Sequence, residues 1–172
     1  YTNYEEGIYV GYRYFDTFKK NVSYPFGYGL SYTSFDYGTP SVKQSKDGFT
    51  VTLSIKNIGN VAGKEVAQLY VSAPKSGIDK PEKELKAFAK TKLLQPGESE
   101  TVTLNLKKQD LASFDEHQNA WVLSGGTYQI LLGSSSRDIR KSSAFSIVKD
   151  VVTERVHNVM ASQQVINELK QL

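Results

Sequence analysis

The sequence predicts an all-β fold in which two antiparallel sheets pack face to face as a sandwich. Three observations support it: apolar and polar residues alternate in short runs, turn-forming residues separate these runs, and helical spacing is scarce before the last 24 residues. The alternation is clearest where Phe49, Val51, Leu53 and Ile55 are each followed by a polar residue. Such a period of two is typical of a strand with one buried face and one solvated face.

Further strands follow at similar intervals, giving about seven or eight strands in all. The expected runs are residues 66–71, 85–94, 102–106, 121–123, 128–132 and 144–148. Between them, Gln95-Pro96-Gly97-Glu98 has the proline and glycine that tight turns require. Ser124-Gly125-Gly126-Thr127 separates two apolar runs and therefore predicts a hairpin.

The first 37 residues form an aromatic-rich leader with a different composition. It holds thirteen of the nineteen Tyr and Phe residues of the chain. Glycines at positions 7, 11, 27 and 29 argue against a helix, so the leader is expected to be extended and partly irregular. Because it has many large rings and little aliphatic mass, we expect it to pack against another surface instead of forming its own core.

The C-terminal tail differs again, because Val152, Val156, Val159 and Met160 fall at helical spacing. We therefore expect a short, broken helix, or a linker that leads into a further domain.

Composition excludes several classes of function. The chain has no cysteine, so it has neither disulfides nor thiolate metal sites. Its net charge of +3 is small, and the alternating charges of Lys80–Lys86 predict a solvated surface, so no nucleic-acid partner is expected. No apolar run approaches the roughly 20 residues of a membrane span. A soluble chain is expected, and bacterial cytoplasm, periplasm and secretion all stay open as its location.

Two motifs in the leader resemble a known family. The segments Glu6–Asp16 and Tyr24–Phe35 are similar to the stretch that joins the α/β-sandwich domain of family 3 glycoside hydrolases to their fibronectin type III-like domain. Four later segments resemble that fibronectin-like domain itself: Lys80–Phe88, Leu94–Ser99, Asp110–Leu111 and Gly133–Arg140.

The resemblance implies a domain organisation and a function. Residues 1–30 would be an interdomain strap at the end of the α/β-sandwich domain, 31–148 an immunoglobulin-like (fibronectin type III-like) β-sandwich, and 149–172 a tail or linker. The chain would be a non-catalytic accessory region of a retaining, β-glucosidase-like enzyme that hydrolyses β-glucosides or related β-glycosides. Its partners would be the other domains of the parent hydrolase.

No catalytic residue and no cofactor are assigned to the chain. In the family the nucleophile is an aspartate within a Ser-Asp-aromatic motif of the barrel domain, and no such triplet occurs here. The local carboxylates Asp115, Glu116, Glu98 and Glu100 lack the apolar surroundings that would raise a pKa for acid catalysis.

No metal site is expected either. The two histidines, His117 and His157, lie forty residues apart, and neither has an acidic cluster beside it at ligand spacing.

The candidate site lies in the leader, where residues could contact either a neighbouring domain or a sugar. These residues are Tyr9, Tyr12, Arg13, Tyr14, Phe26 and Tyr28. Packing at an interdomain surface is the favoured interpretation, with Arg13 anchoring the leader. The alternative is a carbohydrate-binding module whose exposed tyrosines stack on a β-linked oligosaccharide. An adhesion module is allowed by the fold alone. Arg137 and Asp138 are expected to hold a loop to a strand.

Overall fold

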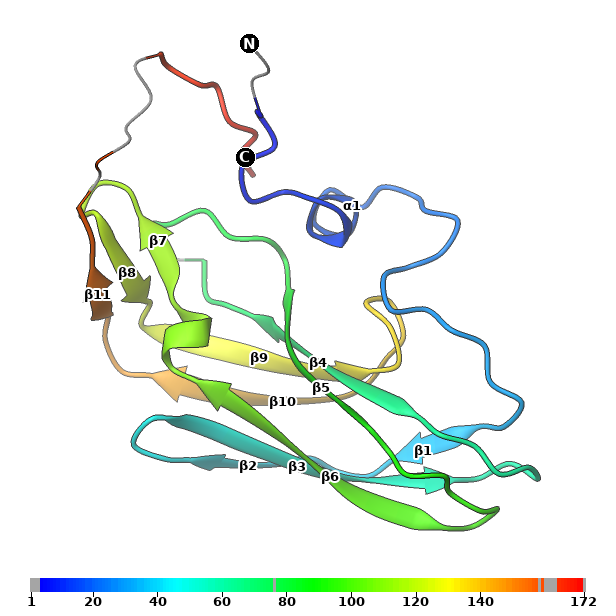
Figure 1. Ribbon diagram of the computed structural model, residues 1–172. Coiled ribbons are helices and arrows are strands. Elements are labelled where there is room, and N and C mark those ends of the chain that lie inside the picture. The colour runs from blue at the N-terminus through cyan, green and yellow to red at the C-terminus, as the bar shows by residue number, and fades with distance from the viewer. Residues whose placement is uncertain (1–3, 76, 158, 160–163, 172) are drawn as a thin grey trace.

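Two four-stranded antiparallel sheets pack against each other in the computed structural model, which describes residues 4–75, 77–157, 159 and 164–171 (Figure 1). In the first sheet, β3 (Gly48–Asn57) pairs with β6 (Ser99–Lys107) along one edge. Along its other edge it pairs with β1 (Phe35–Tyr37) and β2 (Ser41–Gln44).

The second sheet has the strand order β10, β9, β4, β5. These strands are β10 (Ile139–Ile147), β9 (Gly126–Gly133), β4 (Val66–Ser72) and β5 (Glu84–Lys90). The two sheets lie one above the other in Figure 1, and the expected all-β sandwich is confirmed.

A third, three-stranded sheet closes one end of the sandwich. A 3-10 turn, η1 (Gln109–Leu111), leads into β7 (Ser113–Asp115), which pairs with β8 (Ala120–Leu123). On its other edge β8 pairs with β11 (Val151–Arg155). The described part of the chain thus has eleven strands, and the four that sequence analysis did not identify, β1, β2, β7 and β11, have five residues or fewer.

The prediction of a helical tail was wrong where the tail begins. Val152 lies in β11 and pairs with Val122 of β8, and the described residues after β11 contain no helix. The run Val151-Val152-Thr153 is rich in β-branched residues, which favour strands, and the free edge of β8 supplies the hydrogen-bond partners. Met160, part of the same prediction, lies outside the described residues.

The core lies between the two large sheets and confirms the predicted alternation. Phe49, Val51, Leu53 and Ile55 of β3 are buried, while Ser54 and Lys56 on the opposite face are exposed. Each fully buried large side chain contributes about 1.5–3 kcal/mol to stability.

Three aromatic rings connect the two sheets within this core. Phe49 of β3 lies 3.9 Å, centroid to centroid, from Phe145 of β10. Phe145 in turn stacks on Tyr128 of β9 at 5.1 Å. Because these rings come from both sheets, their packing fixes how one sheet lies over the other.

The predicted hairpin across Ser124–Thr127 does not form. β8 and β9 belong to different sheets, and the two glycines carry the chain from one sheet to the other. Gly126 has a φ of 130°, and the amide of Gly125 donates to Asp150 Oδ1 at 2.6 Å. Paired glycines permit a wide bend as readily as a tight turn, so their presence alone did not specify a hairpin.

The prediction that the charged stretch Lys80–Lys86 is a solvated surface was wrong in part, because two of its lysines are buried. Lys80 is buried and donates to Pro74 O (3.0 Å) and Ser124 Oγ (2.7 Å). Lys83 is buried beside Asp16 of the leader. A charged residue can be buried when hydrogen bonds or an opposite charge replace its water, and such partners come from distant parts of the chain.

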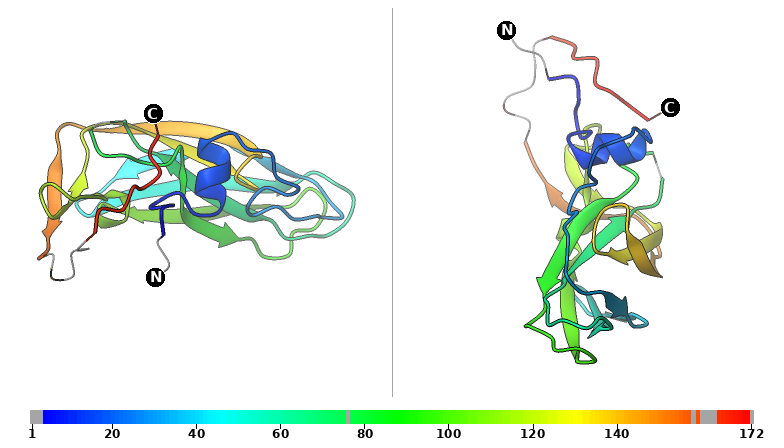
Figure 2. Two further views of the ribbon diagram at one scale, coloured as in Figure 1. Left: turned by 90° about the horizontal axis from the view of Figure 1, so that it is seen from above. Right: turned by 90° about the vertical axis from the view of Figure 1, so that its right-hand side faces the viewer.

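The leader and the described end of the tail lie side by side at one end of the molecule (Figures 1 and 2). The amide of Leu169 donates to Glu5 O at 2.7 Å. Among the described residues, no helix is long and apolar enough to cross a membrane. The proposed domain limits at residues 30 and 148 stay a prediction.

Asn57, at the end of β3, is a fully buried polar side chain that holds several segments together. Its Nδ2 donates to Val61 O (2.8 Å) and Leu94 O (2.9 Å). Its Oδ1 accepts from Thr33 Oγ1 (2.6 Å) and from the Gly59 amide (3.1 Å). One amide therefore connects the end of the leader, the turn after β3 and the segment before β6.

Replacing Asn57 with alanine should lower the free energy of unfolding by about 3 kcal/mol, because several buried groups would lose their hydrogen-bond partner. Urea denaturation of the chain measures this loss. The exposed Asn105→Ala change, which removes one surface hydrogen bond to Thr50, is the control and should cost less than about 1 kcal/mol. Equal losses in the two variants would contradict the role given to Asn57.

Candidate functional site

The leader contains one short helix, α1 (Tyr12–Thr17), which sequence analysis did not expect. Gly11 precedes it with φ 60° and ψ −132°, a conformation that favours glycine. The carbonyl of Gly11 then accepts from the amides of Tyr14 and Phe15. The sequence predicts that this glycine prevents a helix, whereas in the structure it provides the bend from which the helix starts.

Tyr9 is buried against the sandwich. Its hydroxyl donates to Asp79 Oδ1 at 2.7 Å, and its ring meets Phe18 edge to face at 5.0 Å. Burial, followed by the hydrogen bond to Asp79, raises the pKa of the Tyr9 hydroxyl well above its usual range. Tyr9 therefore presents no free ring face to a ligand in this chain.

Tyr12 also faces the sandwich. Its hydroxyl accepts a hydrogen bond from the Leu85 amide of β5 at 2.7 Å. Its ring stacks on Phe26 at 4.4 Å and meets Tyr70 of β4 edge to face at 6.0 Å. Tyr12 thus joins two parts of the leader to the second sheet.

The remaining candidates are more open to solvent. Arg13 pairs with Glu84 of β5 at 2.9 Å, a contact that anchors the leader within this chain. Tyr14 is half-buried beside Phe18, at 5.1 Å between ring centroids. Phe26 and Tyr28 are exposed. The six candidates therefore do not form one exposed row, because Tyr9 is buried.

A group of polar contacts between the leader and the sandwich centres on Arg137 and Asp16. Arg137, in the turn between β9 and β10, donates through Nε to Asp16 Oδ1 at 2.7 Å. Its Nη2 donates to Phe15 O (3.2 Å) and Lys20 O (2.7 Å). On the other side of the carboxylate, Lys83 Nζ lies 3.3 Å from Asp16 Oδ2. The expectation that Arg137 holds its loop to a strand was wrong, since it binds α1 and the residues after it.

The carboxylate of Asp16 is nearly completely buried between these two cations. Burial by itself would raise the pKa of Asp16, but the hydrogen bond from Arg137 and the charge of Lys83 outweigh it and lower the pKa. Asp16 is therefore ionised at neutral pH. A general acid needs the opposite shift.

Gln68 of β4 holds the next part of the leader. Its Nε2 donates to Gly27 O (3.1 Å) and Ser134 O (2.6 Å), and its Oε1 accepts from the Tyr70 hydroxyl (2.5 Å). Gly27 lies so close that a Cβ there would overlap the Gln68 amide. A polar residue in the otherwise apolar run Val66–Val71 is a signal that could have identified this contact from sequence.

The carboxylates considered for catalysis lie at or near the surface, and several accept hydrogen bonds from neighbouring residues. The hydrogen bond from Lys92 lowers the pKa of Glu98, and the hydrogen bond from the Gln118 side chain lowers that of Asp115. Both shifts oppose general acid catalysis at neutral pH. Over the described ranges, no three His, Asp or Glu side chains come together as metal ligands.

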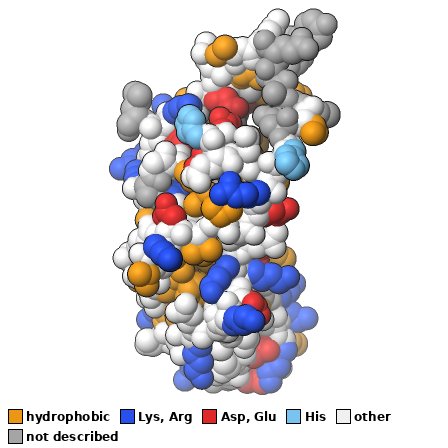
Figure 3. Space-filling model, turned by 90° about the vertical axis from the view of Figure 1, so that its left-hand side faces the viewer, with side chains coloured by type: hydrophobic (Ala, Val, Ile, Leu, Met, Phe, Trp, Pro, Cys, Tyr) orange, Lys and Arg blue, Asp and Glu red, His pale blue; other side chains and the backbone are white. Residues whose placement is uncertain are grey.

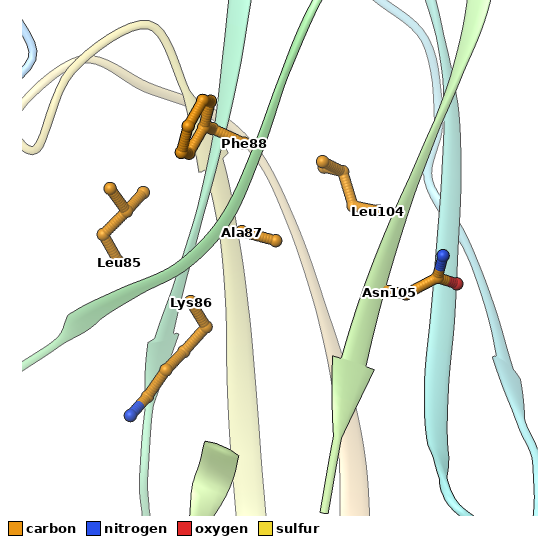
Figure 4. A pocket seen from close by; sticks show the side chains of 6 residues that line it. All are labelled: Leu85, Lys86, Ala87, Phe88, Leu104 and Asn105. Carbon is orange, nitrogen blue, oxygen red and sulfur yellow. The ribbon is translucent and has the colours of Figure 1, made fainter.

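An open groove of about 390 Å³ lies between the edge strands β5 and β6 (Figure 4). Ala87 and Leu104 lie on facing strands in this view. The other lining residues are Leu85, Lys86, Phe88 and Asn105. Since none of these residues has a carboxyl group, the groove lacks the pair of acids that glycoside hydrolysis requires.

Comparison with known proteins supports a family. The profile of the fibronectin type III-like domain matches residues 65–136. β-Glucosidase A of Butyrivibrio fibrisolvens is 44% identical over 181 residues, which cover 92% of this chain and 22% of the relative. Thermostable β-glucosidase B of Acetivibrio thermocellus is 47% identical over 140 residues, covering 79% of this chain and 18% of the relative.

Solved structures agree with these relatives. A β-glucosidase from Paenibacillus barengoltzii superposes with a TM-score of 0.87 at 40% identity, covering 95% of this chain and 19% of its own. The GH3 β-glucosidase of Bifidobacterium adolescentis gives a TM-score of 0.78 at 34% identity, with coverages of 90% and 23%.

The sandwich defines a fibronectin type III-like domain, and the leader is fixed across it. These partial matches to β-glucosidases, one of them named a GH3 enzyme, are consistent with a fibronectin type III-like accessory region of a family 3 glycoside hydrolase. It spans about a fifth of the length of the curated relatives it matches.

Replacing Arg137 with alanine should destabilise the leader by about 2 kcal/mol, because the buried carboxylate of Asp16 and two carbonyls would lose a partner. Urea denaturation and hydrogen exchange of residues 12–20 measure the change. The matched control is Arg13→Ala, which removes a more exposed pair across the same interface and should cost about 0–1 kcal/mol. A smaller effect at Arg137 than at Arg13 would contradict the assignment.

The low pKa of Asp16 predicts a specific dependence on pH. The stability it contributes is present above the unfolded-state pKa of about 3.9 and is lost as pH falls toward its lower folded-state pKa. The stability gap between the wild type and Asp16→Asn should therefore be widest near neutral pH and narrow below about pH 4. Denaturation midpoints across this range test it. The exposed Asp47→Asn variant is the control, and a gap that widens in acid would refute the argument.

Proposed function

We propose that the parent protein hydrolyses β-glucosides or related β-glycosides, and that this region supports its catalytic domains without supplying a catalytic residue. The observation that carries the proposal is the likeness to proteins named β-glucosidases, of which this chain matches about a fifth. The described carboxylates add to it, because those considered for catalysis are solvated or held in ion pairs.

The six leader residues are proposed as interdomain positions. The buried Tyr9 and the engaged hydroxyl of Tyr12 support contact within the protein over stacking on a sugar. Tyr9 and Tyr12 fix the leader on the sandwich, so that the leader is held at a defined place and angle. Arg13, Tyr14, Phe26 and Tyr28 lie on the more open side of the same segment.

Assays on a chromogenic β-glucoside should give turnover with the full parent protein and none with residues 1–172 alone. The physical reason is that retaining hydrolysis needs two carboxyl groups about 5–5.5 Å apart across the scissile bond. A chromogenic β-xyloside assayed in parallel tests the substrate class. Appreciable hydrolysis by the isolated chain would contradict a non-catalytic role, whereas inactivity of the parent on both substrates would contradict the proposed activity.

A further inference from the structure

One edge of the second sheet is left open by the fold. Within the described residues, β10 is the last strand of that sheet and pairs with β9 alone. It lies along one border of the molecule when seen from above (Figure 2, left view). The outer side of an edge strand presents backbone amides and carbonyls that lack a ladder partner, so such a strand is a template on which another strand can pair.

The sequence of β10 lacks the protection that such an edge commonly has. Residues 142–148 contain no Lys, Arg, Asp, Glu, Gly or Pro. Charged side chains, prolines and bulges within an edge strand usually prevent pairing with another chain. Here the charges lie at the two ends, as Arg140 and Lys141 before the run and Lys149 after it, and the irregular pairing with β9 lies between Ile139 and Lys141. The middle of β10 is therefore unguarded.

β10 also leaves apolar side chains incompletely covered. Phe145 and Ile147 pack against the core but are only partly buried. On β6, an edge strand of the first sheet, the inward residues Val102, Leu104 and Leu106 are 5%, 2% and 2% exposed. A further strand beside β10 would remove apolar area from water, and this favours association.

Other exposed parts of the surface are guarded by charge or by hydrogen bonds. On β5, at the opposite edge of the same sheet, the Leu85 amide donates to the Tyr12 hydroxyl, and Lys86 and Lys90 add charges along the strand. On the face that includes β7, β8 and β11, Lys and Arg side chains surround small hydrophobic patches (Figure 3). Apolar residues scattered among charges are normal on a solvated surface. β10 differs from β5 and β6 because it is both unguarded and incompletely covered.

A hollow of about 230 Å³ lies beside the end of β10. It is lined by residues 146–149, by Gln44 of β2, by Leu123 of β8 and by Val151 of β11. Space for the side chains of an added strand therefore exists at this edge.

We propose that two copies of the chain associate through β10, which pairs antiparallel with β10 of the second copy. Each copy then offers the same surface, as a two-fold axis requires. Main-chain hydrogen bonds supply the affinity, as they do wherever an extended segment adds to a sheet edge. Because the pairing covers the open edge of both copies at once, association ends at a dimer.

The sequence of β10 favours a second copy because it is complementary to itself. With the two-fold axis at Ala144, Ser142 of one copy lies opposite Ser146 of the other, and Lys141 lies opposite Ile147. No two like charges face each other in this register. The uncharged middle of the strand then forms the centre of the ladder.

The neighbouring registers are less favourable. An axis at Phe145 would place Lys141 opposite Lys149, and like charges that lie directly opposite destabilise a strand pair. An axis at Ser143 would bring the irregular end of β10, at Ile139, into the new ladder. The axis at Ala144 avoids both penalties.

Analytical ultracentrifugation of the full parent protein and of residues 1–172 measures the association. A single strand pair forms a small interface, so we expect a weak dimer in both, with a dissociation constant on the order of 10 μM. A parent that stays monomeric well above this concentration would overturn the proposal, because other parts of the parent would then occupy or block the edge. Open-ended aggregates would overturn it as well.

Charges introduced at the axis test both the edge and the register. Ala144→Lys and Ala144→Glu should each weaken the dimer about fivefold, because two like charges would lie directly opposite. An equimolar mixture of the two variants should associate at least as tightly as the wild type, because opposite charges then meet. Ala144 is exposed, so neither variant should change the unfolding midpoint of the monomer.

The matched control for these variants is Thr103→Lys, which adds the same charge at an exposed position of the edge strand β6 and should leave the association unchanged. An equal loss of association in this control would contradict the assignment to β10. A mixture of the Ala144→Lys and Ala144→Glu variants that fails to associate would contradict the two-fold pairing.

The lack of cysteine in residues 1–172 permits a direct test by cross-linking. Under oxidising conditions Ala144→Cys should form a covalent dimer, because residues directly opposite in a strand pair have Cβ atoms about 4.5–5.5 Å apart. Ser142→Cys is exposed on the same face of β10 but should cross-link far more slowly, because its two copies would lie about 13 Å apart along the strands. Equal cross-linking of the two variants would refute the proposal.

Discussion

The contact between the two large sheets is the constraint on which every other feature of this chain depends. Alternating residues of β3 and β6 supply one wall of the core, and β4 and β9 supply the other. The ring of Phe145 lies against rings from both sheets, so neither sheet can shift without losing that packing. Since the core fixes the turn between β9 and β10, it also fixes Arg137 and therefore the leader.

The leader is held by polar contacts at the sandwich and leaves apolar rings on its outer side. Asp16 can be buried only because Arg137 and Lys83 compensate for its lost hydration. Tyr12 and Gln68 add hydrogen bonds that specify where the leader runs. Because hydrogen bonds are directional, these contacts determine the path of the leader across the sandwich.

Several predictions from sequence failed for a common physical reason. The tail spacing of Val152 and Val156 fits a helix, but β8 had a free edge, and pairing with that edge satisfied the backbone better. Gly125 and Gly126 permit many conformations, and packing between sheets selected a bend over a hairpin. The sequence predicts that Lys83 is a solvated surface charge, but the fold places Asp16 of the leader beside it. In each case a long-range partner outweighed the local preference.

The sequence by itself determined the strands of the core and the face that each one buries, because side chains on a strand alternate with a period that is visible in one dimension. It also located the candidate site in the aromatic leader, since composition is a local property. Only the tertiary structure decided which strands pair and which polar groups meet. Asp16 and Arg137 are 121 residues apart, and no local pattern relates them. Their contact exists because the folded sheets bring the turn between β9 and β10 against α1.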